Sequence, residues 1–182
     1  MDWKSKDIVS LNTLNLILLA STIETTMFAE LQKHITGKNI LILGVGNRAR
    51  GDDGIGSYLV RRLQKKINIP VIDAGEMPEK SLALIESSGA DLVLIVDAAD
   101  MGVTPGEFSL LELDDLKNMG VSTHTANLSL LFNIMPKQKR PHGLLIAVQP
   151  DSTSGNQLSS EARNALDGLE QLFLQLFREE EK

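Results

Sequence analysis

The chain has 182 residues, of which 42% are hydrophobic, so it is long enough for one globular domain with a sizeable core. Its formal net charge of −6 gives no positive field for phosphate backbones, which argues against nucleic-acid binding. Because the sequence contains no cysteine, disulfides, thiolate metal sites and cysteine nucleophiles are excluded, and any metal must be bound by oxygen or imidazole.

The N-terminal segment, residues 1–36, contains no glycine or proline and predicts one long amphipathic helix that ends at Gly37. Its apolar run from Leu14 to Ala20 is too short to cross a bilayer, so we expect a cytoplasmic protein without membrane insertion. The apolar stripe of this helix favours packing on the rest of the chain, with a homo-oligomer through the N-terminal helix as the alternative.

Strands and helices alternate in the remaining sequence. Short apolar runs predict buried strands at 39–44, 70–73, 91–97 and 143–148, and alternating residues predict an edge strand at 107–113. Helical spacing predicts helices at 53–67, 79–88, 126–135 and 159–177. This order predicts an α/β fold, a three-layer α/β/α arrangement with a twisted, mostly parallel sheet of about five strands. We expect an N-terminal helical extension, residues 1–37, and an α/β domain, residues 38–182.

Polar residues gather where ligands bind in such sheets, beyond the carboxyl ends of the strands. The candidates for a three-ligand site for Ni²⁺, Zn²⁺ or another divalent ion are Asp53, Asp97 and His124. Each also has an ordinary structural explanation. Asp53, or its neighbour Asp52, could cap a helix, Asp97 could be a loop residue, and His124 could be a hydrogen-bonded surface histidine. A helix start just after His124 would keep its imidazole neutral and able to bind metal.

A dinucleotide site is the main rival. Gly44, Gly46 and Ala49 follow a predicted strand in the spacing of a dinucleotide fingerprint, and Asp73 ends the next strand, where a ribose-binding acid would lie. However, Asp52 and Asp53 would bring negative charge to the helix start that should receive the pyrophosphate.

Several ordered motifs together resemble a known family, the nickel–iron hydrogenase maturation endopeptidases, most closely the hydrogenase-3 type. The resemblance runs from about Asn39 to Phe177. Its motifs are Gly44-Val-Gly46-Asn47 with Gly51-Asp-Asp-Gly54, Val71-Ile-Asp-Ala-Gly75 with Pro78-Glu79, Leu94-Ile-Val-Asp-Ala98 with Asp100-Met-Gly102 and Pro105-Gly106-Glu107, Thr123-His124, and Gln149-Pro150-Asp151.

The resemblance implies an enzyme that cleaves the C-terminal extension from a hydrogenase large-subunit precursor after nickel has been inserted. By motif matching it implies that Asp53, Asp97 and His124 bind metal and are the catalytic residues. It also implies that nickel arrives with the substrate, although other divalent metals could occupy the site in vitro. Two alternatives stay open, a dinucleotide-binding enzyme and a nickel-sensing carrier that binds without cutting.

Overall fold

A computed structural model describes residues 26–113, 129–130 and 132–177. The chain divides into two units, Met1–Thr36 and Gly37–Lys182. In the first unit residues 26–35 form an α-helix, and the remainder of the predicted helix, residues 1–25, lies outside the described residues. No described helix combines the length and apolar character that a membrane crossing requires.

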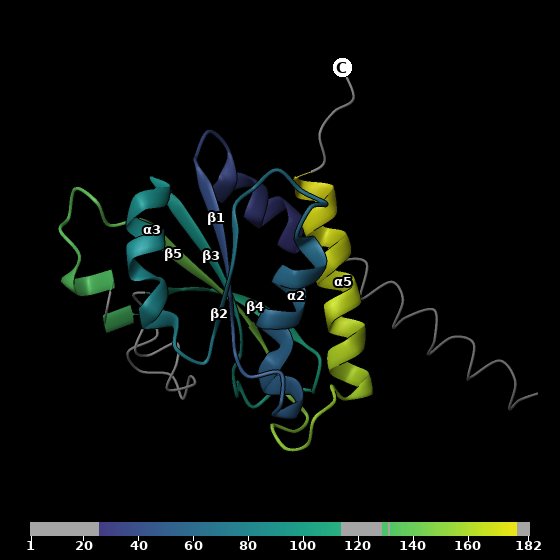
Figure 1. Ribbon diagram of the computed structural model, residues 1–182. Coiled ribbons are helices and arrows are strands. Elements are labelled where there is room, and N and C mark those ends of the chain that lie inside the picture. The colour runs from purple at the N-terminus through teal and green to yellow at the C-terminus, as the bar shows by residue number, and fades with distance from the viewer. Residues whose placement is uncertain (1–25, 114–128, 131, 178–182) are drawn as a thin grey trace, which may run out of the picture. The chain divides into compact units, whose positions relative to one another are not determined.

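The second unit contains a five-stranded sheet in the order β2-β1-β3-β5-β4 (Figure 1). The strands are β1 (Ile40–Val45), β2 (Val71–Gly75), β3 (Leu92–Ala98), β4 (Phe108–Glu112) and β5 (His142–Val148). Four of them run parallel, and β4 pairs antiparallel with β5 at one edge. The prediction of a mostly parallel sheet with residues 107–113 at its edge is therefore confirmed.

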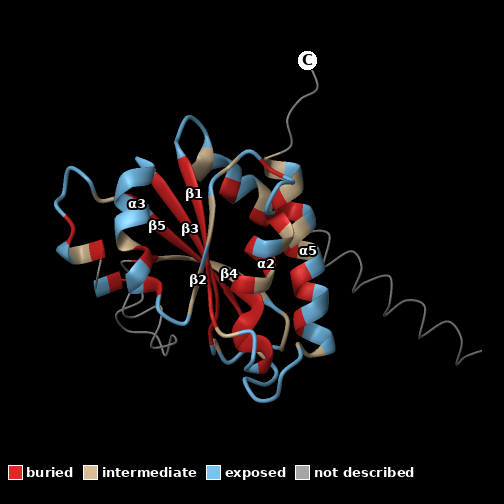
Figure 2. Cartoon of the chain, in the orientation of Figure 1, coloured by how far each residue is buried: buried red, intermediate tan, exposed pale blue. Residues whose placement is uncertain are grey.

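Helices cover both faces of this sheet. Strands β1, β3 and β5 are buried along almost their whole length (Figure 2), as expected for strands covered on two sides. On one face, Leu41, Leu43 and Val45 of β1 pack in a cluster with Ile85 of α3 (Leu82–Ser88) and with Phe132. The opposite face is covered by α2 (Ile55–Leu63) and α5 (Ser160–Leu176) (Figure 1), which confirms the predicted three layers.

The predicted helix at 53–67 is wrong at both ends. It starts with a separate 3₁₀ turn, η1 (Gly51–Gly54), and α2 stops at Leu63. The helix ends because the backbone leaves helical angles here: ψ of Gln64 is 129°, which is extended, and φ of Lys65 is +65°. A similar turn, η2 (Pro78–Ser81), precedes α3, which ends at the left-handed Gly89.

Of the last two predicted helices, one is confirmed and the other is only partly described. The helix at 159–177 is confirmed as α5, and the Ser159 hydroxyl caps it by accepting a hydrogen bond from the Ala162 amide at 3.0 Å. In the helix predicted at 126–135, residues 129–130 and 132–134 are helical, whereas 126–128 and 131 lie outside the described residues.

The first turn of α2 lies directly against the backbones of two strands. A Cβ added to Gly56 would lie 2.0 Å from the Val96 oxygen of β3 and 2.5 Å from the Val45 oxygen of β1. A Cβ on Gly44 would lie 2.2 Å from the Gly56 oxygen. Only glycine permits this approach, because each obstacle is backbone that cannot turn aside. The approach holds η1, immediately before α2, beside the carboxyl ends of β1 and β3.

Asp52 fastens η1 to the distant segment 151–159. Its buried carboxylate accepts four hydrogen bonds, from the amides of Asp151 (2.9 Å), Ser152 (3.2 Å) and Ser159 (2.7 Å) and from the Ser159 hydroxyl (2.8 Å). Burial tends to raise the pKa of Asp52, but these donors outweigh it and hold the pKa below its usual value. Neither η1 nor α2 has a side-chain cap, so helix capping does not explain the pair Asp52 and Asp53.

We expect Gly56→Ala to lower the free energy of unfolding by about 3 kcal/mol or more, because the new methyl group would overlap two backbone oxygens. Gly143→Ala is the comparison and should cost less, since its Cβ would meet side chains alone, Cδ2 and Cβ of Leu113 at 2.7 and 3.0 Å and the Phe132 ring at 3.1 Å, rather than backbone oxygens. Urea unfolding of both variants measures the difference. Equal losses would contradict the rigid contact between α2 and the strands.

Asp52→Asn should lower the free energy of unfolding at pH 7 by about 1–3 kcal/mol. The new side-chain NH₂ group would replace one carboxylate oxygen and face N–H and O–H groups that need an acceptor. Since the folded-state pKa lies below the ordinary 3.8, the stabilisation by the carboxylate is complete above that value and is lost as the pH falls through the folded-state pKa. Urea unfolding from pH 7 to pH 3 should therefore show the wild type converging on the variant at the acid end. Asp167→Asn, which alters an exposed ion pair with Arg62, is the control, and its effect should stay below about 1 kcal/mol.

Candidate functional site

The sheet has its topological switch point between β1 and β3. The chain leaves β1 through α2 to reach β2 on one side, and leaves β2 through α3 to reach β3 on the other side of β1. The connection through α2 crosses one face of the sheet and the connection through α3 crosses the other. A crevice therefore lies between them, beyond the carboxyl ends of β1 and β3. The predicted candidates Asp53 and Asp97 belong to the two segments at this edge, η1 and β3, which contact each other.

Asp53 has one carboxylate oxygen engaged and one without a donor. Its Oδ2 accepts a hydrogen bond from the Asn47 amide at 2.7 Å, and no other described residue donates to the carboxylate. The residue is 8% exposed. A largely buried carboxylate with one oxygen fixed by a backbone amide and the other available is a suitable ligand for a hard or borderline cation.

Asp97 lies inside β3, opposite Ala147 of β5 in the sheet register, and is 0% exposed. It is therefore not the ordinary loop residue that could have followed the strand. Burying an ionised carboxylate costs free energy that hydrogen bonds or a cation must offset, so buried aspartates at the end of a parallel strand are candidates for function. The structure thus brings two of the three predicted residues to one edge of the sheet.

The third candidate, His124, lies outside the described residues. His142 is at the opposite end of the sheet, because it starts β5 in register with Leu92, five residues before Asp97 along β3. At about 3.3 Å per residue this separates His142 from the Asp97 level by roughly 16 Å. Its Nε2 lies 3.0 Å from Oε2 of Glu112, so His142 has a local partner away from the crevice.

Gln149, at the end of β5, orients the loop that follows Asp97. Its side chain is buried. Oε1 accepts a hydrogen bond from the backbone amide of Met101 at 2.7 Å, and Nε2 donates one to Oδ1 of Asp100 at 3.2 Å. The sequence interpretation gave Gln149 no role. The available signal was a polar residue directly after the apolar run 143–148, since such a residue is buried only when its hydrogen bonds are satisfied.

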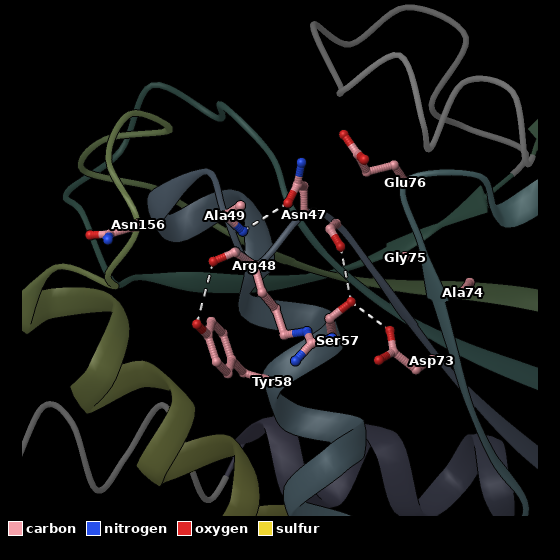
Figure 3. A pocket seen from close by; sticks show the side chains of 11 residues that line it. Asn47, Arg48, Ala49, Ser57, Tyr58, Asp73, Ala74, Gly75, Glu76 and Asn156 are labelled. Carbon is pink, nitrogen blue, oxygen red and sulfur yellow. Dashed lines mark hydrogen bonds between the residues drawn. The ribbon is translucent and has the colours of Figure 1, made fainter.

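An open pocket of about 670 Å³ lies beside Asp53, between the β1–α2 loop, α2 and the end of β2 (Figure 3). It is lined by Gly46, Asn47, Arg48, Ala49, Ser57, Tyr58, Asp73, Ala74, Gly75, Glu76 and Asn156. Most of these are polar, and Ser57 and Asp73 point toward each other, joined by a hydrogen bond of 2.6 Å. The pocket is polar, unlike the largely apolar cavities that bind most small organic ligands.

The glycine-rich loop does not form an open phosphate cradle. Its amides donate to acceptors of the protein itself: Gly46 to Gly75, Asn47 to Asp53, Ala49 and Arg50 to Asn47, Gly51 to Gly155, Asp52 to Ser152, and Asp53 to Arg50. The Asp53 carboxylate takes the amide of Asn47, which a pyrophosphate would need. The loop geometry therefore opposes the dinucleotide alternative.

Comparisons with known proteins identify the family of the chain. The chain matches the HycI family model, described as hydrogenase maturation protease, over residues 54–176. It is 36% identical over 114 residues to the hydrogenase 3 maturation protease of Escherichia coli K12, covering 61% of this chain and 72% of that protein. It is 26% identical over 152 residues to a putative hydrogenase maturation protease of Methanocaldococcus jannaschii, covering 78% of this chain and 90% of that one.

Solved structures that resemble this chain are also hydrogenase maturation proteases. The crystal structure of the [NiFe] hydrogenase maturation protease HycI from Thermococcus kodakarensis superposes with a TM-score of 0.73 at 31% identity, covering 82% of this chain and 99% of that one. The resemblance in the sequence motifs, including its closeness to the hydrogenase-3 type, is confirmed. The chain belongs to the hydrogenase maturation protease family.

Proposed function

We propose that this protease removes the C-terminal extension of a nickel–iron hydrogenase large-subunit precursor once that precursor carries nickel. The observation that supports this most directly is the pairing of two largely buried aspartates, Asp53 and Asp97, at the switch point of a maturation-protease fold. The curated relatives named as hydrogenase maturation proteases support the substrate class. We assign the peptidase activity to residues 38–182 because every candidate site residue lies there.

Asp53, Asp97 and His124 are the proposed ligands and catalytic residues, and nickel is treated as part of the substrate. The donor set fits a divalent cation of borderline hardness, with carboxylate oxygens and one imidazole. Nickel held between protease and precursor would polarise the scissile carbonyl or lower the pKa of a water molecule. The residues of the chain then bind the ion, orient the precursor at the crevice and, through the buried carboxylates, accept a proton from the attacking water.

A nickel-sensing carrier that binds without cutting uses the same ligands, so cleavage itself separates the two functions. If the precursor bound tightly in a nickel-dependent manner and its mass never changed, the carrier would be the correct function. The sequence expectation of a cytoplasmic enzyme is retained as part of this proposal.

Asp53→Ala, Asp97→Ala and His124→Ala should each reduce the rate of precursor cleavage by more than about 100-fold. Loss of a direct ligand should exceed the 10- to 100-fold effect typical of residues that only support a ligand. Mass spectrometry of the precursor measures cleavage, and circular dichroism with thermal unfolding shows whether each variant is folded. His142→Ala is the matched control, since its imidazole pairs with Glu112 at the other end of the sheet, and it should cut at the normal rate. A folded triple mutant that still trimmed the precursor would refute the assignment.

Nickel-free precursor should resist cleavage, because the ion that joins the protease to its substrate would be missing. The experiment incubates the wild-type protease with nickel-loaded and with strictly chelated precursor and follows the C-terminus by mass spectrometry. Adding nickel back to the chelated precursor is the control and should restore cutting. Equal rates for both precursors would show a conventional hydrolase without metal gating.

A further inference from the structure

One peptide group connects the pocket to Asp53. The carbonyl oxygen of Gly46 lies 2.9 Å from the Ser57 hydroxyl, and the amide of the same peptide group, that of Asn47, donates to Oδ2 of Asp53 at 2.7 Å. The peptide is trans, so its C=O and N–H point in opposite directions. Ser57 therefore contacts one side of a rigid group whose other side holds the carboxylate.

The orientation of this peptide group is not fixed by the backbone alone. Gly46 is anchored by its own amide, which donates to the Gly75 oxygen at 2.9 Å, but a half-turn of the peptide group changes ψ of Gly46, which no side chain restricts, together with φ of Asn47. Rotated by half a turn, the Gly46 carbonyl would face the Asp53 carboxylate, and the Asn47 amide would face Ser57. Asp73, beyond Ser57, carries a carboxylate that would attract that amide.

Ser57 opposes this rotation in either of its hydrogen-bonding states. Its single proton can be donated to the Gly46 oxygen, which holds the carbonyl directly. It can instead be donated to Oδ1 of Asp73 at 2.6 Å, which satisfies the acceptor that would otherwise attract the Asn47 amide. Ser57 is 1% exposed, so water does not replace the hydroxyl easily.

We propose that Ser57 is a positioning residue for Asp53. Acting through the Gly46–Asn47 peptide group, it keeps Oδ2 of Asp53 bound to the Asn47 amide and leaves Oδ1 available to the ion. The orientation of the carboxylate follows from the contacts above, whereas its consequence for nickel rests on the proposed function. Groups that orient a metal ligand typically change affinity or activity by about 10- to 100-fold.

The first test follows the Asn47 amide proton by NMR in the full-length protein. In Ser57→Ala this resonance should move upfield and exchange faster with solvent, because its bond to a carboxylate is lost. Asp73→Asn should leave it in place, since the new side-chain amide can donate to Ser57 and the hydroxyl proton remains for Gly46. Ser129→Ala is the matched control, removing a buried hydroxyl that donates to the Leu113 oxygen at 3.2 Å on the other face of the sheet. An unchanged Asn47 resonance in Ser57→Ala would overturn the inference.

The second test measures nickel affinity of the isolated protein by titration and kcat/KM for nickel-loaded precursor. Ser57→Ala should lower both by about 10- to 100-fold, while Ser129→Ala should change neither, although both lose one buried hydroxyl. Asp53→Asn is run in parallel. If Asp53→Asn abolishes binding and cleavage but Ser57→Ala alters neither, the positioning role is wrong and the site stands. If Asp53→Asn binds and cuts normally, the nickel role of Asp53 is wrong, and the amide resonance alone still decides whether Ser57 orients it.

Discussion

The direct contact between the first turn of α2 and the backbones of β1 and β3 is the constraint on which the site depends. Gly44 and Gly56 let a helix approach strand oxygens at distances that any side chain would prevent. The 3₁₀ turn before the helix is thereby brought to the carboxyl edge of the sheet, next to the end of β3. Without this approach, Asp53 on the turn and Asp97 on the strand would not belong to one crevice.

Adjacent aspartates on that turn have separate tasks. Asp52 directs its carboxylate to segment 151–159 and accepts four hydrogen bonds there, which satisfies it and makes it a structural fastener. Asp53 accepts one amide and keeps an oxygen without a donor among the described residues. The difference lies in how many donors surround each carboxylate. A saturated acceptor stabilises the fold, whereas a partly satisfied one can still bind an ion.

Much of the fold follows from the sequence because its signals are local. Apolar runs identify the strands, and the alternating pattern of 107–113 identifies the edge strand β4. The placement of the site follows in part, since strand order brings Asp53 and Asp97 to one edge, while the roles of Asp53, Asp97 and His124 stay predictions. What the sequence does not reveal depends on distant partners. Asp52 meets donors 99 to 107 positions away, and nothing in its neighbourhood distinguishes it from Asp53. The early end of α2 at Gln64 and Lys65 is also not evident from the sequence, because neither a glycine nor a proline marks it.

The β1–α2 loop and segment 151–159 are joined by hydrogen bonds, and almost all of these use backbone groups of segment 151–159. We call this contact the seam. Gly51 and Asp52 donate to the oxygens of Gly155 and Ser152, and the Asp52 carboxylate accepts three backbone amides. Side chains between Asp151 and Ser159 are thus largely dispensable for the seam. One of them, Asn156, lines the pocket beside Asp53. Mutations at Asn156 can therefore reshape the pocket wall without loosening the turn that carries Asp53.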